Sequence, residues 1–210
     1  YLNYSSSTKK DAQLKLSLVY VLMDGGFYQE AMDSIHSILV NHVDSKQAIT
    51  AKYLEGHMYY AFGLLDSAQM SYQEYLSYTD TDSYLVAASL MGIAACSEEK
   101  SQYDRAIDYY FKVLKDYPNY FRVDEAFANM ARCYDVKGDV SQAYTLYKEF
   151  MDKYPDSPLY NRVVLMLARI ESRGKGAKVP IKPSSPSANE IIESPQSGEI
   201  GDIDENKGES

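Results

Sequence analysis

Apolar residues recur along this chain with helical periodicity, in stretches that come in pairs. Within a stretch, apolar residues lie three and four positions apart, which is typical of amphipathic helices. In the first pair the two stripes are Leu14, Leu18, Val21, Leu22 and then Ala31, Ile35, Ile38, Leu39. Turns separate the paired stretches at Gly25 and Gly26 and around Gly63, Ser101 and Gly138. The pattern predicts four helical hairpins.

The hairpins form an internal repeat. Four alanines stand 37, 38 and 37 residues apart, and a large residue follows each one four positions later: Ala31 with Ile35, Ala68 with Tyr72, Ala106 with Tyr110, and Ala143 with Tyr147. Alanine lets the two helices of a hairpin approach closely, and the large residue fills the groove beside it. Repeat arrays bind other proteins far more often than they catalyse reactions.

Prolines predict where the later helices end. The matching segments 116–118 and 153–155 each finish in proline, which disfavours helical geometry in the residue before it. Ser157 as N-cap and Pro158 at the first helical position predict a further helix over about 159–173, which we interpret as a C-terminal cap. The repeats then span about 12–45, 49–82, 87–120 and 124–157, within an array over 8–173.

The fourth unit resembles the tetratricopeptide repeat most fully. It carries the family's spacing in Phe127, Met130, Ala131, Tyr134, Gly138, Ala143, Tyr147 and Pro155. Phe127 stands where tryptophan is usual and Ala131 where glycine is usual, and the first unit matches less well. The resemblance implies an all-α fold, a right-handed superhelical solenoid of four hairpins plus the cap helix, and a scaffold that binds other proteins.

In this family the first helices of the hairpins line a concave groove. Carrying the groove spacing onto this chain gives an aromatic end and a charged end. The candidate residues for binding a peptide or partner are Tyr20, Tyr53, His57, Tyr60, Met91 and Arg132. Such a lining would accept apolar side chains, with tyrosine hydroxyls and His57 holding the peptide backbone. The alternative is that the aromatic stripe belongs to the core, as stripes at helical spacing usually do.

One familiar role of the family is not expected. Co-chaperones of this type hold a partner's terminal carboxylate with several charge-assisted donors. The corresponding places here hold Leu16 and Tyr20, Leu54, and Ala88 with Gly92. The carboxylate clamp is therefore missing.

Composition and motifs narrow the function further. The net charge of −9 and the pI of about 4.8 argue against nucleic acid as a partner. Histidines and acidic pairs are scattered, no phosphate-binding or metal motif occurs, and we expect neither an enzyme nor a cofactor. Cys96 and Cys133 lie at equivalent places of consecutive repeats, about 8 to 10 Å apart, too far for a disulfide. We interpret both as buried thiols.

The two ends of the chain differ from the array. No run of 18 apolar residues occurs, so no transmembrane helix or signal peptide is expected. Residues 1–7 resemble the segment after a membrane anchor, which would have preceded Tyr1. Residues 174–210 are rich in proline, glycine, serine and acidic residues and are predicted to be disordered, with residues 190–193 as a minor docking candidate.

Two bacterial envelope groups of the family are similar to this chain in amino-acid sequence, notably over residues 87–96 and 153–158. One comprises single-pass ancillary subunits of the protein translocon. The other comprises outer-membrane assembly lipoproteins and coordinators of envelope constriction. The resemblance implies a location at the extracytoplasmic (periplasmic) face of the inner membrane, with translocon or outer-membrane assembly components as partners. A self-associating structural module and a cytosolic adaptor are the alternatives.

Overall fold

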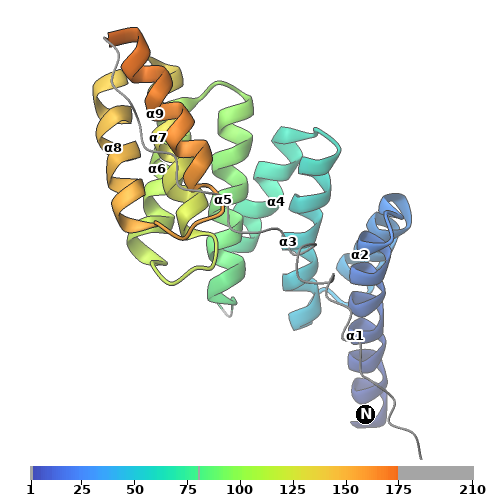
Figure 1. The fold of residues 1–210 in the computed structure, drawn as a ribbon. Coiled ribbons are helices and arrows are strands. Elements are labelled where there is room, and N and C mark those ends of the chain that lie inside the picture. Colours follow the sequence, from blue (N-terminus) through green and yellow to red (C-terminus); the bar gives the residue numbers. More distant parts are fainter. Residues whose placement is uncertain (1, 80, 175–210) are drawn as a thin grey trace, which may run out of the picture. The chain divides into compact units, whose positions relative to one another are not determined.

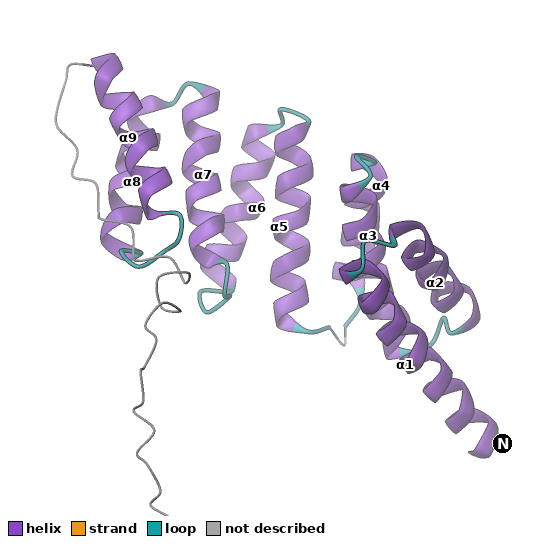
Figure 2. Cartoon of the chain, turned by 45° about the vertical axis from the view of Figure 1, so that its right-hand side comes forward, coloured by secondary structure: helices purple, strands orange, loops and turns teal. Residues whose placement is uncertain are grey.

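The computed structural model describes residues 2–79 and 81–174, and the side chains of residues 9–79 and 81–172. All regular secondary structure in these ranges is helical, so the all-α prediction is confirmed (Figure 2). The helices are α1 Leu2–Asp24, α2 Tyr28–Asn41, α3 Lys46–Ala61, α4 Leu65–Ser77, α5 Ser83–Glu99, α6 Tyr103–Asp116, α7 Val123–Lys137, α8 Val140–Lys153 and α9 Tyr160–Gly174.

Consecutive helices pack side by side in a row that runs from α1 to α9 (Figure 1). Each helix packs mainly on the helix before it and the helix after it. In addition α3 touches both α1 and α5, so first helices of adjacent hairpins meet. This layering is the predicted solenoid of helical hairpins.

The turns within the hairpins lie where the sequence predicts them. Gly26, Gly63 and Gly138 have φ values of 77°, 73° and 95°, and the equivalent Ser101 has φ 58°. This left-handed region is strained for most side chains and free for glycine. Three of the four hairpins therefore use glycine to reverse the chain.

The ends of the second helices also follow the sequence. Helix α6 ends at Asp116 and α8 ends at Lys153, each two residues before a proline. The last helix starts one residue later than predicted, at Tyr160, because Pro158 and Leu159 form a turn after Ser157. In that turn the Ser157 hydroxyl accepts a hydrogen bond of 3.0 Å from the Leu159 N–H.

The small and large positions of the repeat form the core. The four repeated alanines are completely buried, and the large residues that follow them are at most 3% exposed. One apolar cluster spans α5 to α9, a second spans α1 to α3, and a smaller one containing Tyr72 links α3, α4 and α5. Cys96 and Cys133 are buried free thiols.

The apolar stripe of α1 does not face this core. Leu14, Leu18 and Val21 are 70%, 46% and 67% exposed, whereas Leu16 and Val19 are buried. Helix α1 packs mainly on α2 and α3, and its Leu14, Leu18 and Val21 side faces away from them.

Two predictions concern the ends of the chain, where the described residues begin and stop. Residues 2–7, predicted as an extension ahead of the array, are the first turns of α1. The predicted disordered tail, including the docking candidate at 190–193, lies outside the described residues apart from position 174 at the end of α9. No helix in the described part of the chain is both long and apolar enough to span a bilayer.

Candidate functional site

Five of the six predicted groove residues line one pocket. Its volume is about 260 Å³, and the first helices of the second, third and fourth hairpins supply most of its wall. Helix α3 contributes Tyr53, His57 and Tyr60, α5 contributes Met91, and α7 contributes Arg132. The sixth residue, Tyr20, lies on α1, outside the lining of this pocket, and is 48% exposed.

One wall of the pocket is aromatic. The Tyr53 ring lies 6.0 Å from the ring of Tyr72 and 5.9 Å from that of Tyr75, both on α4. Tyr53 is half-buried, so it belongs to the core with one part of its ring and to the pocket with another. Burial raises the pKa of Tyr53 to about 12, and its hydroxyl therefore stays protonated at neutral pH.

Small residues of α5 keep the middle of the pocket open. Ala88, Gly92 and Ala95 lie along the helix at intervals of three and four residues, on one face. Met91 is almost buried, at 7% exposed, yet it still lines the pocket. The middle of the pocket therefore offers apolar contact without bulk.

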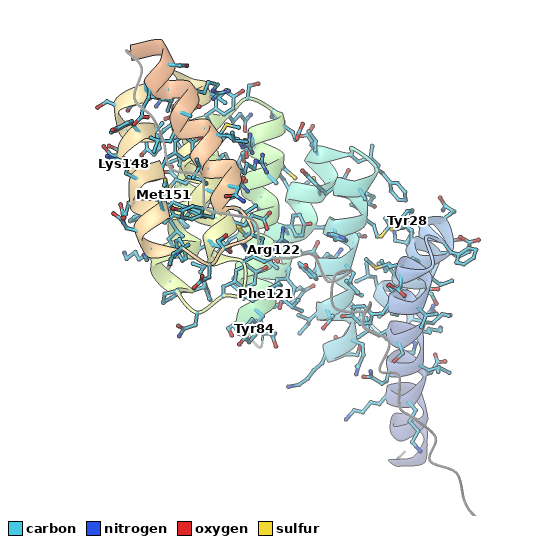
Figure 3. All side chains as sticks on the ribbon, viewed as in Figure 1. Tyr28, Tyr84, Phe121, Arg122, Lys148 and Met151 are labelled. Carbon is cyan, nitrogen blue, oxygen red and sulfur yellow. The ribbon has the colours of Figure 1, made fainter. Side chains whose placement is uncertain are left out.

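The opposite wall is charged. Arg132 forms an ion pair with Glu98, whose side chain is only 8% exposed. The Tyr110 hydroxyl donates a hydrogen bond of 3.0 Å to the other oxygen of Glu98. Nearer the rim, Arg122 donates two hydrogen bonds of 2.7 Å to Glu125. Figure 3 labels Arg122 on the segment that enters α7.

Two polar groups that line the pocket have unusual surroundings. The Nε of Arg132 is buried and has no acceptor among the described residues. A buried donor without an acceptor is unfavourable by about 1–3 kcal/mol. Burial, and then the charge of Arg122, lower the pKa of His57. At neutral pH its imidazole is therefore uncharged and can both donate and accept.

Sequence reasoning missed several lining residues. Tyr72 and Tyr110 were expected only as packing residues, but their rings extend from the core into the pocket wall. Asn129 lies one turn from both Glu125 and Arg132, so helical spacing could have found it. Arg122 precedes α7, where no helical spacing applies, and nothing in the sequence pattern indicated it.

Two of the three residues at the clamp positions of the first and second hairpins are core residues, and the third is the exposed Tyr20. Leu16 and Leu54 are 7% and 3% exposed and belong to the apolar cluster of α1 to α3. Neither can donate a hydrogen bond from its side chain. These two positions therefore contribute nothing to a carboxylate clamp.

Comparison with known protein families identifies two of these hairpins. The tetratricopeptide repeat family model matches residues 88–120 and 125–157, the third and fourth hairpins. No curated protein sequence matches the chain significantly.

Solved structures with the same arrangement of helices are numerous. A tetratricopeptide repeat protein from Parabacteroides merdae is 16% identical, with a TM-score of 0.64 over 78% of this chain and 61% of its own. PilF of Pseudomonas aeruginosa is 15% identical, with a TM-score of 0.62 over 80% of this chain and 71% of its own. PilW, a type IV pilus biogenesis factor, is 20% identical, with a TM-score of 0.60 over 77% and 69%.

These comparisons establish the fold and the repeat. The chain spans less than two thirds of the Parabacteroides structure, and the identities are too low to carry a partner across. Three observations indicate the same repeat: the buried alanine and tyrosine positions, the glycine turns, and the segments that the family model matches. The chain contains tetratricopeptide repeats and has the helical-hairpin solenoid fold of that family.

Proposed function

We propose that this protein is a non-enzymatic scaffold that binds a polypeptide segment in the pocket between α3, α5 and α7. The observation that carries the proposal is the convergence of Tyr53, Tyr60, Met91 and Arg132 on one pocket from three successive first helices. A tetratricopeptide solenoid is in general a protein-interaction scaffold.

The pocket chemistry favours a peptide over a small charged metabolite. Tyr53, Tyr60 and Met91 surround a space suited to one apolar side chain, since aromatic anchors of this kind supply most of the binding energy at interfaces. A backbone carbonyl of the same segment would accept a hydrogen bond from the exposed part of the guanidinium of Arg132, whose side chain is 33% exposed. His57, uncharged, would hold a neighbouring backbone group.

A catalytic role is not part of the proposal. Of the three carboxylates that line the pocket, Glu98 and Glu125 form ion pairs with arginine, and Glu99 is exposed at the end of α5. General acid or base chemistry needs a carboxyl free to exchange a proton with a bound substrate. The arrangement serves recognition better than reaction.

Site-specific photo-crosslinking in cells tests the proposal. A photoreactive amino acid replaces Tyr60, which is half-buried at the pocket, and in a control it replaces Tyr28, which is 48% exposed on α2. We expect adducts at position 60 that are absent at position 28. Capture of one stoichiometric partner would indicate an assembly scaffold, and capture of many unfolded chains a chaperone-like groove.

Binding by purified components completes the test. The captured segment, made as a peptide, should bind the wild-type protein and bind Tyr60→Ala and Arg132→Gln at least tenfold more weakly, with Tyr28→Ala unchanged. Equal binding by all four proteins, each shown by circular dichroism to be folded at the assay temperature, would place the site elsewhere.

We further propose a location at a bacterial cell envelope, at the extracytoplasmic face of the inner membrane. Support comes from the amino-acid sequence of residues 87–96 and 153–158, and from the similarity in fold to PilW, a pilus biogenesis factor. Protease treatment of spheroplasts expressing the full-length protein tests it. Degradation without lysis is expected, and full protection before lysis would contradict the proposal.

A further inference from the structure

One face of α1 is apolar and open to solvent. Leu14, Leu18 and Val21 lie four and three positions apart and are 70%, 46% and 67% exposed. They lie on the side of the helix away from Leu16 and Val19, which pack into the core. A contiguous apolar stripe of this kind on a helix surface usually marks an interaction site.

Helix α1 lies at the end of the helix row opposite α9 (Figure 1). It packs mainly on α2 and α3. Its stripe of Leu14, Leu18 and Val21 therefore has no cover among the described residues and is open to a partner.

Charges at the two ends of the stripe indicate what covers it. Lys10 lies one turn before Leu14, and Asp24 lies one turn after Val21, on the same side of the helix. Both are exposed, and neither forms an ion pair among the described residues. The two charges are 14 residues apart, which is about 21 Å along a helix.

This arrangement is complementary to itself when the helix is reversed. Lys10 and Asp24 are each seven residues from Ser17, so two α1 helices packed antiparallel about Ser17 bring Lys10 of each copy beside Asp24 of the other. Leu14 of one copy then lies next to Val21 of the other. A parallel pair would instead place like charges together, which is unfavourable.

Ser17 suits the centre of such a contact. Its side chain is small, so two helices can approach closely there. Its hydroxyl already donates a hydrogen bond of 3.1 Å to the Gln13 carbonyl of its own helix. Burying Ser17 between two helices therefore leaves no donor without a partner.

We propose that α1 forms a symmetric antiparallel dimer with a second copy of the chain, through Leu14, Leu18 and Val21 with Lys10–Asp24 ion pairs at both ends. The pocket between α3, α5 and α7 uses no residue of α1 and stays open in this dimer. Two such pockets in one assembly would bind a partner with two sites more tightly than either pocket alone.

Analytical ultracentrifugation of the purified protein over a range of concentrations tests the dimer. A single helix pair buries less area than a standard interface, so we expect weak association, with a dissociation constant of about 100 μM. Leu18→Asp should raise that constant at least tenfold. The matched control is Leu165→Asp, because Leu165 is 59% exposed on α9 at the other end of the row. It should leave the constant unchanged.

A charge exchange tests the geometry. Lys10→Glu places like charges together at both ends and should weaken the dimer by about tenfold at low salt, as should Asp24→Lys. The double variant Lys10→Glu with Asp24→Lys restores opposite charges and should return to within about threefold of the wild type. Circular dichroism melting confirms that all variants fold alike.

Several results would overturn the proposal. A wild-type monomer at about 0.5 mM would show that no second copy covers the face, and that it serves another protein instead. A dimer weakened equally by Leu18→Asp and Leu165→Asp would remove α1 from the interface. Failure of the double variant to recover would rule out the antiparallel pairing.

Discussion

The ring of Tyr72 packs closely against Gly92. A Cβ atom added at Gly92 would lie 2.4 Å from Cε2 of the Tyr72 ring, and one added at Gly56 would lie 2.8 Å from Cδ1 of the same ring. Tyr72 on α4 therefore fits between α3 and α5 because both helices present glycine to it. The same ring forms part of the pocket wall, so this packing also shapes the candidate site.

Gly92→Ala should destabilise the fold. The methyl group meets ring carbons that are held on the other side by α3, and overpacking of this kind costs about 1–3 kcal/mol. Urea unfolding followed by circular dichroism measures the loss. Combining Gly92→Ala with Tyr72→Leu should cost less than the sum of the two single changes, because the smaller side chain makes room. Full additivity would show that the contact is not the cause.

Tyr60 and Tyr72 should respond differently to truncation, although both line the pocket. Tyr72 is 3% exposed, so Tyr72→Ala should lower the free energy of unfolding by about 3–5 kcal/mol. Tyr60 is only half-buried, and Tyr60→Ala should cost about 1 kcal/mol or less. Parallel urea titrations of the two variants compare them. Equal losses would mean that Tyr60 is a core residue.

The buried carboxylate of Asp135 depends on α9. Its side chain is 2% exposed and pairs with Arg169. Arg169→Ala should cost about 1–3 kcal/mol, because it leaves a buried charge without its partner. Adding Asp135→Asn should recover part of that loss. The control is Arg162→Ala, an exposed arginine of the same helix, which should change the midpoint of urea unfolding little.

Stability should fall in alkaline solution. Burial raises the pKa of Tyr53 and Tyr147 to about 12 and that of the Cys96 thiol to about 11, from ordinary values of 10.0 and 9.0. Because these pKa values are higher in the folded state, the unfolded state loses protons first. The stabilisation is complete below about pH 9 and is lost as the pH rises through about 11 to 12. Unfolding in urea at several pH values measures it.

Tyr147→Phe is the matched variant for this pH dependence. The Tyr147 hydroxyl is buried without a hydrogen-bond partner among the described residues, so its removal should cost little at neutral pH. The variant should lose less stability than the wild type between pH 9 and 12, because one titrating group is gone. An identical loss would mean that Tyr147 does not contribute.

Much of the fold could be read from local patterns. The turn glycines, the prolines after α6 and α8, and the alternation of alanine with a large residue all depend on backbone geometry within one hairpin. Local preferences of this kind agree with the native fold, so they can be recognised in the sequence. Ala106 and Tyr110 could therefore be assigned to the core without coordinates, and both are buried.

The groove spacing carried over from the family resemblance placed five of the six candidates around one pocket. It left Tyr20 apart, because the pocket begins at α3. It also missed Arg122, which comes from an irregular segment whose course depends on the packing of α6 on α7. Whether the candidate residues bind a partner is for the crosslinking and binding experiments to decide.

The amino-acid pattern alone predicted that α1 is a helix, with apolar residues at helical spacing. It could not say which of its two apolar faces would be buried, because Leu14, Leu18 and Val21 are as apolar as Leu16 and Val19. The tertiary structure decided this, since α2 and α3 reach only one side of the helix. A side chain is buried only when the fold brings neighbouring elements against it. The periodic sequence shows which side chains of α1 are apolar, and it does not show which of them have such neighbours.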